Sequence, residues 1–253
     1  MSVSGKQKLR GKFGDGQPLQ RSCFPSMNGP TDLIIWGAKG HAKVLREFMP
    51  AQNFRIVGLV DNDPNVVPPF PDAPVLHGKA GLAEFLAQRS RTISGIVAVG
   101  GFRGRDRIEI QGIMAALGIN VVGAIHPSAY VARDAVLGTG SQALAHASVG
   151  AEARIGAACI LNTSCSVDHE CVLGDGVHIA PGAILAGCVV IGDGSFIGPG
   201  AVVAAGTAIG ADTIVGAGSV VVSSLPSMVV AYGNPARVVR ENAQDSPALS
   251  RTV

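Results

Sequence analysis

The sequence predicts two architectures in one chain: an α/β domain with a parallel, Rossmann-like sheet, followed by an all-β parallel β-helix. Strand-like apolar runs alternate with amphipathic, helix-like runs in the first half, and aliphatic residues recur every six residues in the second half. The composition agrees, because 34 glycines and only 4% aromatic residues in a chain of 253 suit a Gly-rich solenoid better than a conventional core.

Residues 1–30 precede both predicted domains. They hold five basic residues against one Asp, among Gly, Ser and Pro, and this predicts a disordered leader, with a tether to an acidic surface as the functional alternative. The chain shows no apolar run of transmembrane length and no secretory signal, so we expect a cytoplasmic protein without membrane insertion. The net charge of +2 argues neither for nor against an acidic partner, and no nucleic-acid partner is expected.

The α/β domain is expected over 31–125. Each predicted strand is a short apolar run bounded by Gly, Pro or Asp, and each predicted helix is a longer run of mixed polarity. Alternation of the two implies a parallel sheet. In chain order, the pattern predicts a strand at 32–37, a helix at 42–49, a strand at 54–60, a Pro-rich loop at 64–74, a helix at 79–89, a strand at 93–99, a helix at 104–117 and a strand at 119–124.

A Gly-rich turn, Gly37–His41, follows the first predicted strand. Ligands on parallel sheets bind at the carboxyl ends of strands, and free N–H groups at a helix start favour phosphate. Asp61 ends the next strand, where a carboxylate can accept a hydrogen bond from a ribose hydroxyl. The spacing Gly-x-x-Gly-His is not the dinucleotide fingerprint. A nucleotide or nucleotide-sugar site is therefore favoured over an NAD site or a purely structural turn.

The β-helix is expected over 126–240. Sixteen six-residue units run from Val131 without a slip, and fifteen of their first positions are Val, Ile or Leu. These side chains and the small residues at the fifth position point inward, as strand alternation requires. Gly or Ala at the second position is expected to form the tight corner. Three units make one triangular coil, so residues eighteen apart stack, and an unbroken coil leaves pockets only at corners, at the flanking domain or at a neighbouring subunit.

Three cysteines, Cys159, Cys165 and Cys171, occupy the inward fifth position of consecutive units. They are expected to be small core residues. No Cys-x-x-Cys pair occurs, so no metal site is predicted. Residues 241–253 are expected to form a flexible tail.

His169 is the candidate general base. It is the third residue of its unit, at a corner, and histidine can take a proton near neutral pH. Glu170 beside it can orient the ring. His178 is the sixth residue of its unit, pointing outward from a face, half a coil from His169, so the two can meet only across an interface. Asn162 stands where most units have Gly or Ala. Taken alone, a corner histidine can be merely solvated, and Asn162 can be a corner amide that bonds its own backbone.

Five segments together carry a family resemblance. They are a strand end with GAKGHAKV at 36–44, VDN at 60–62, HPSA at 126–129, NTSCSVDHECVLGDGVHI at 162–179 and YGNPAR at 232–237. These segments resemble the sialic acid O-acetyltransferase/PglD-type nucleotide-sugar N-acetyltransferases, a family of hexapeptide-repeat acyltransferases. Asn-Thr-Ser followed by His-Glu-Cys, with a further histidine nine residues on, is specific among hexapeptide proteins. The resemblance covers about 31–240.

The resemblance implies a homotrimer with a left-handed β-helix and acetyl-CoA, as co-substrate, lying along the prism. It implies that His169 is the general base with Glu170 as its partner, that His178 lies near the thioester carbonyl, and that Asn162 is an active-site residue. The implied CoA contacts are Gly187, Ala205, Ala217 and Pro235.

The resemblance also implies that the α/β domain holds a nucleotide-linked amino sugar. Two departures from the family pattern, Lys39 and Asn62, leave the nucleotide base open, and both UDP- and GDP-linked 4-amino-4,6-dideoxy sugars are candidates. Two further arginines, Arg103 and Arg107, leave the assignment of Arg105 open. The implied contacts are Gly37, Gly40, His41, Asp61, Asn62 and Arg105.

The predicted reaction is direct transfer of the acetyl group from acetyl-CoA to the sugar amine, without a metal. An O-acetyltransferase acting on a sugar hydroxyl is the first alternative, and assays of an amino-sugar nucleotide against its hydroxyl analogue separate the two. A metal-dependent hydratase of the γ-carbonic anhydrase kind is a second, decided by metal analysis of the pure protein. A non-enzymatic scaffold is a third, favoured if acetyl-CoA does not bind.

Overall fold

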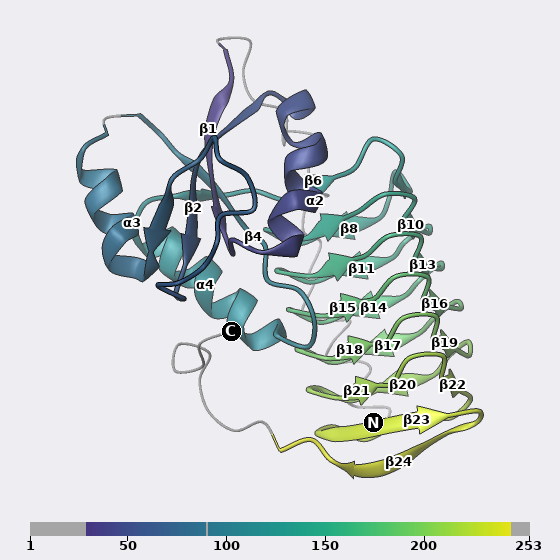
Figure 1. Cartoon of the computed structure of the whole chain (residues 1–253). Coiled ribbons are helices and arrows are strands. Elements are labelled where there is room, and N and C mark those ends of the chain that lie inside the picture. Colours follow the sequence, from purple (N-terminus) through teal and green to yellow (C-terminus); the bar gives the residue numbers. More distant parts are fainter. Residues whose placement is uncertain (1–28, 90, 244–253) are drawn as a thin grey trace.

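The computed structural model describes residues 29–89 and 91–243, as an α/β domain beside a long three-sided prism (Figure 1). Nearly all of the predicted leader at 1–30 and most of the predicted tail at 241–253 lie outside the described residues. Within the described part of the chain, no helix is both long and apolar enough to cross a membrane.

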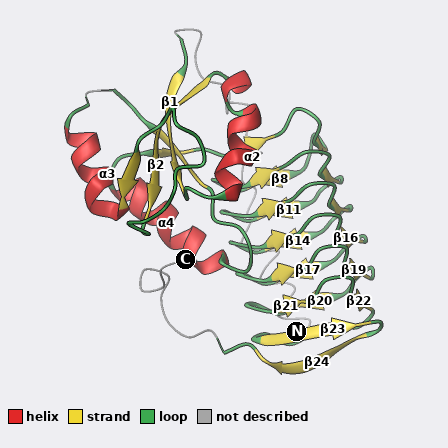
Figure 2. Cartoon of the chain, viewed as in Figure 1, coloured by secondary structure: helices red, strands yellow, loops and turns green. Residues whose placement is uncertain are grey.

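The α/β domain has a five-stranded parallel sheet in the order β3-β2-β1-β4-β5, as alternation predicts. One face packs on α2 and the other on α3 and α4 (Figure 2). Apolar residues three apart in α2, at Ala42, Leu45 and Phe48, are buried there. The elements are β1 (Thr31–Trp36), α2 (Gly40–Phe48), a 3-10 turn (Pro50–Gln52), β2 (Phe54–Asp61), β3 (Val75–His77), α3 (Gly78–Ala87), β4 (Ser94–Val97), α4 (Gly104–Ala116) and β5 (Asn120–Val121).

The prism is the predicted β-helix, built from parallel strands of two residues in three sheets, which we call faces I, II and III, with a longer antiparallel hairpin at the end of face I. Face I holds β6 (Ala124–Ile125), β9 (Gln142–Ala143), β12 (Ile160–Leu161), β15 (His178–Ile179), β18 (Phe196–Ile197), β21 (Ile214–Val215), β23 (Val229–Gly233) and β24 (Ala236–Glu241). Face II holds β7 (Tyr130–Val131), β10 (Ser148–Val149), β13 (Ser166–Val167), β16 (Ile184–Leu185), β19 (Val202–Val203) and β22 (Val220–Val221). Face III holds β8 (Val136–Leu137), β11 (Arg154–Ile155), β14 (Val172–Leu173), β17 (Val190–Ile191) and β20 (Ala208–Ile209).

Residues eighteen apart pair along each face, as in Leu161 with Ile179. The first- and fifth-position side chains fill one continuous core, which confirms the predicted inward positions. The three cysteines belong to it, one at each corner of a single coil, and burial raises the pKa of Cys159 and of Cys165 to about 12. Their thiols therefore stay protonated near neutral pH and act as small apolar groups.

The corner residues correct one expectation. Second-position glycines do not make the turn; they allow the coils to stack, because a Cβ on Gly156 would lie 2.5 Å from the carbonyl carbon of Gly174 in the next coil. The fourth position makes the turn, in the left-handed region that glycine adopts most easily. Seven non-Gly residues accept positive φ angles there: His146, Glu152, Ala158, Ser164, Glu170, Cys188 and Asp212.

The ends of the elements also differ from the sequence prediction. β3 and the hairpin β23–β24 are not predicted, and the hairpin extends face I beyond β21. The predicted strand at 119–124 is divided, since β5 pairs with β4 while β6 already pairs with β9 of the prism. The prism therefore begins at the end of the expected α/β domain.

The α/β domain packs on face I and on the corner between faces III and I. Its helix α4 presents a buried stripe at helical spacing, Gly104, Arg107 and Gln111, and a Cβ on Gly104 would lie 2.3 Å from the carbonyl oxygen of Gly176. Ile160 of face I joins the hydrophobic cluster of α2. This attachment fixes which side of the prism the domain covers.

We expect Gly156→Ala to lower the free energy of unfolding by about 1–3 kcal/mol, because its new methyl group would force two coils apart. Gly112→Ala is the matched control, since nothing lies within 4 Å of a Cβ on this residue of α4, and alanine favours the helix by up to about 1 kcal/mol. Urea unfolding measures both. Equal stability of the two variants would contradict the role given to the second-position glycines.

Candidate active site

A cavity of about 300 Å³ opens at the carboxyl ends of β1, β2 and β4. It brings together five of the predicted sugar-nucleotide contacts: Gly37, Gly40, His41, Asp61 and Asn62. The remaining lining residues come from the end of β1, the loop between β4 and α4, and the first turns of α4: Trp36, Lys39, Ala98, Val99, Gly100, Arg103, Asp106, Glu109 and Ile110.

The turn between β1 and α2 is shaped for close approach. Gly37 has a φ of 114°, and a Cβ there would lie 2.4 Å from the carbonyl oxygen of Ala98. The carboxylate of Asp61 accepts hydrogen bonds from the backbone N–H groups of Ala38 (2.9 Å) and Asp63 (3.0 Å). Asp61 therefore holds the turn in place besides facing the cavity. No side chain caps α2, so the N-terminus of this helix favours a negatively charged group.

The two basic side chains that line the cavity, Lys39 and Arg103, already have acidic partners. The Nζ atom of Lys39 lies 3.6 Å from Asp63, and Arg103 pairs with Asp106. Each pair has a net charge near zero, so neither side chain offers an uncompensated positive charge to a ligand.

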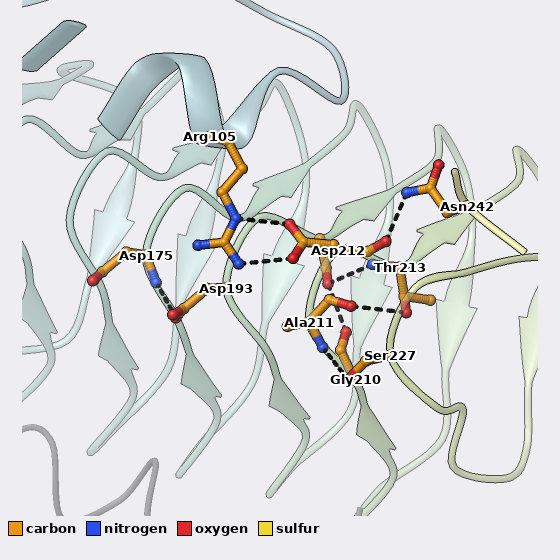
Figure 3. A network of polar contacts seen from close by, with 10 residues as sticks. Arg105, Asp175, Asp193, Gly210, Ala211, Asp212, Thr213, Ser227 and Asn242 are labelled. Carbon is orange, nitrogen blue, oxygen red and sulfur yellow. Dashed lines mark hydrogen bonds and ion pairs between the residues drawn. The ribbon is translucent and has the colours of Figure 1, made fainter. Parts of the chain in front are cut away.

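Arg105, predicted to contact the sugar nucleotide, does not line the cavity. Its guanidinium makes two hydrogen bonds with Asp212 of the prism, at 2.8 and 2.7 Å (Figure 3). The hydrogen bonds to Asp212 raise the pKa of Arg105, as do the charges of Asp193 and Asp175. Arg105 is thus an interdomain ion pair at the III/I corner.

His41 connects the cavity to face I. Its Nε2 atom lies 2.7 Å from Oε1 of Gln142, whose amide nitrogen donates to the carbonyl of Val97 at 2.6 Å. Because the Gln142 oxygen can only accept, the ring carries its proton on Nε2, which leaves Nδ1 as an acceptor. Burial lowers the pKa of His41, so the ring is neutral near pH 7.

His178 is buried between face I and the loop that follows β4. Its Nδ1 atom donates to the carbonyl of Gly101 (2.9 Å), and its Nε2 atom therefore accepts from the amide of Asn162 (3.1 Å). Burial, aided by the charge of Arg107, lowers the pKa of His178 to about 3. Both nitrogens of this neutral ring are occupied within the chain, so here His178 orients Asn162 and the loop.

His169 lies at the corner between faces II and III, with 55% of its side chain exposed. Its Nδ1 atom is 3.2 Å from a carboxylate oxygen of Glu170. The other edge of the ring rests on Gly187 in the next coil, where a Cβ would lie 2.4 Å from Nε2. The imidazole is therefore held between a carboxylate and a bare backbone, with Nε2 as the nitrogen available for proton transfer.

The four residues implied for CoA binding do not lie close together within a single chain. Gly187 and exposed Ala205 follow His169 down the II/III corner at intervals of eighteen residues, and thus form a column of small residues. Exposed Ala217 lies at the I/II corner, as does Asn162, and Pro235 follows a cis peptide bond in the β23–β24 turn. Cys188 and Glu170 also lie in the II/III column and, with His169, bring three potential ligand atoms within 4.8 Å of one another.

The cavity and His169 belong to different sides of the same chain. The α/β domain covers face I, and the II/III corner is the one corner of the prism that face I does not touch. A ligand in the cavity therefore cannot reach His169 of its own chain without passing around the prism.

Two residues of the site have weak signals in the sequence, and a third has none. Gly187 is the only glycine at the third position of the sixteen units, and its φ is ordinary, so the repeat itself marks a position where space is needed. Arg107 lies at helical spacing from Gly104 and Gln111. Because this buried stripe is polar, a search for apolar periodicity does not find it. Gln142 carries no sequence signal, because its role depends on the docked domain.

Comparisons with known proteins confirm the predicted family and fold. Residues 32–110 match the family model of the PglD N-terminal domain, and 188–223 match that of the bacterial transferase hexapeptide (six repeats). PerB from Caulobacter crescentus, solved with CoA and GDP-perosamine, is 38% identical, with 85% of this chain and 98% of that chain covered and a TM-score of 0.74. A mutant of perosamine N-acetyltransferase from the same organism is 37% identical, with 85% of this chain and 99% of that chain covered and a TM-score of 0.76. The acetyltransferase domain of PglB from Neisseria gonorrhoeae, with acetyl coenzyme A, is 34% identical over 83% and 100%, with a TM-score of 0.73.

The buried neutral ring of His178 makes stability depend on pH. Its pKa is about 3 in the folded chain against the ordinary 6.5, so the unfolded chain binds one more proton between these values. The contribution of His178 to the free energy of unfolding is therefore fully present above pH 6.5. It is lost on acidification, by up to about 1.4 kcal/mol per pH unit. Urea unfolding from pH 7 to 4 should show a shallower fall for His178→Gln than for the wild type. Identical slopes would contradict the assignment.

Proposed function

This chain belongs to the PglD-type family of hexapeptide-repeat nucleotide-sugar N-acetyltransferases, and we propose that it transfers the acetyl group of acetyl-CoA to the amine of a nucleotide-linked amino-deoxy sugar. The observation that carries the proposal is the corner imidazole of His169, flanked by Glu170 and seated on Gly187. The cavity at the N-terminus of α2 supports a nucleotide-linked acceptor, because an N-terminal helix end favours phosphate. Comparison with the perosamine N-acetyltransferase supports N- over O-acetylation.

The reaction is a direct transfer between two bound substrates. The amine nitrogen attacks the thioester carbonyl carbon, and Nε2 of His169 removes a proton from the nitrogen as the N–C bond forms. The tetrahedral intermediate then expels the CoA thiolate, and the imidazolium returns the proton to it. Glu170 holds Nδ1 and stabilises the imidazolium between the two steps. No metal takes part.

We propose a homotrimer in which the catalytic site is completed between chains. The II/III corner of one prism, with His169, faces the α/β domain and the I/II corner of a neighbour, with Asn162 and Ala217. The separation of cavity and His169 within one chain supports this arrangement, as do the exposed apolar side chains of face II, Tyr130, Ile184 and Val202. The use of acetyl-CoA supports a cytoplasmic location.

Replacing the base tests the chemistry. His169→Ala should lower kcat by roughly 10²–10⁴, the usual contribution of a general base, with little effect on the affinity for CoA. Glu170→Gln should lower kcat by about tenfold, since the imidazolium loses its counter-charge. The matched control is Glu152→Gln, one coil away at the same corner position with φ 57°. Steady-state kinetics with acetyl-CoA and an amino-sugar nucleotide measure all three, and wild-type turnover by His169→Ala would end the proposal.

Mixed oligomers test the shared site. His169→Ala removes the base from one chain, and Gly40→Glu puts a negative charge into the cavity of another, where a Cβ meets nothing within 4 Å. Each variant alone should be inactive. Co-expressed chains should recover roughly a quarter of the wild-type activity, because one pairing in four then joins an intact cavity to an intact base. Activity that stays at background in isolated mixed oligomers would exclude a site shared between chains.

A further inference from the structure

Arg107 is a buried guanidinium on α4 that is 1% exposed. It makes hydrogen bonds only to backbone carbonyls: Nε to Ala158 (2.9 Å), NH2 to Gly176 (2.6 Å), and NH1 to Val99 (3.2 Å) and Gly101 (3.4 Å). The first two belong to the prism and the last two to the loop between β4 and α4. One side chain therefore joins the prism to the edge of the cavity.

The positive charge of Arg107 has no anionic partner among the described residues. No carboxylate of the described residues forms an ion pair with it, and the group whose charge would raise its pKa is Cys159, whose thiol stays protonated. Burial lowers the pKa of Arg107 to about 10, so the guanidinium is still charged near neutral pH. A buried charge without a counter-charge destabilises the folded protein. We therefore expect this charge to have a functional role.

Arg107 is hydrogen-bonded to the wall of the cavity but does not line it. Val99, which accepts one of its hydrogen bonds, lines the cavity. Its charge also helps to lower the pKa values of His41, a lining residue, and of His178. Its field therefore reaches the cavity, where both exposed cations are already paired with carboxylates.

We propose that the buried charge of Arg107 attracts and holds the diphosphate of the nucleotide sugar, and that the exposed Arg105, two residues away, does not. This inference rests on the proposed function, since it names the residue that selects a diphosphate-linked acceptor. Two phosphate groups at the N-terminus of α2 provide the counter-charge that the protein itself lacks. Because the charge is buried, solvent screens it little.

Arg107 also fixes the loop against which the ligand binds. The carbonyls of Val97, Val99 and Gly101 are held by Gln142, Arg107 and His178 respectively, with His178 and Arg107 sharing Gly101. The charge and the loop are thus set before the substrate arrives, and binding needs little rearrangement. A neutral residue that still donates hydrogen bonds separates the two contributions.

The test compares Arg107→Gln with Arg105→Gln in the full-length chain. Calorimetry measures the Kd of UDP and GDP, of uridine and guanosine, and of CoA. Glutamine keeps two N–H donors of the five in arginine and removes the charge. We expect Arg107→Gln to weaken the better-bound nucleoside diphosphate by about tenfold to a hundredfold, with nucleoside and CoA affinities within about threefold. Arg105→Gln should leave all affinities within about threefold, since its charge is already paired with Asp212.

Each outcome is decisive. Unchanged diphosphate affinity in Arg107→Gln, or an equal loss for nucleoside, diphosphate and CoA, overturns the inference. Wild-type protein that binds CoA but no nucleotide overturns the proposed acceptor instead. If Arg107→Gln does not fold, Arg107→Lys decides, because lysine keeps the charge but not the planar fork. A folded lysine variant should retain its preference for diphosphate over nucleoside, and loss of that preference contradicts the inference.

Discussion

The stacking of coils eighteen residues apart is the constraint on which the rest of this structure depends. It places a bare glycine, Gly187, under the ring of His169 and keeps Glu170 at the same exposed edge. The stacking also fixes the orientation of the three faces relative to one another. The α/β domain, which packs on face I, therefore lies away from the II/III corner. The prism therefore separates the cavity from His169 within each chain, and this separation is the reason for proposing a site completed between chains.

Burial sets the electrostatics between the two domains. His41 and His178 are neutral because desolvation and the nearby charge of Arg107 disfavour their protonated forms. As neutral rings, each can donate from one nitrogen and accept at the other, which links Gln142 to the cavity and Asn162 to the loop after β4. The positive charge of this region is thereby concentrated on Arg107, which is hydrogen-bonded to the wall of the cavity, and the exposed Arg105 is neutralised by Asp212 (Figure 3).

Much of this arrangement follows from sequence because it is local or periodic. The six-residue repeat predicts the prism and its cysteine core, and the Gly37–His41 turn with Asp61 predicts the cavity. Features that arise from the packing of the two domains were not predictable from the sequence. One is the burial of Arg107 in a polar stripe of α4, and another is the ion pair between Arg105 and Asp212, which are 107 residues apart. The fourth position holds seven glycines, but the second position holds eight, so glycine frequency alone points to the second position as the turn. Seven non-Gly residues also adopt positive φ angles at the fourth position, and their composition does not reveal that conformation. The roles assigned to His169, Glu170, His178 and Asn162 stay predictions.

The central claim is that the base of one chain serves the cavity of another. A crystal structure with CoA and an amino-sugar nucleotide bound together measures this most directly. The account predicts the sugar amine about 3 Å from Nε2 of His169, within hydrogen-bond reach, with the nucleotide held by the α/β domain of a different chain. An amine that meets no His169, or that meets His169 of the chain holding the nucleotide, would contradict it.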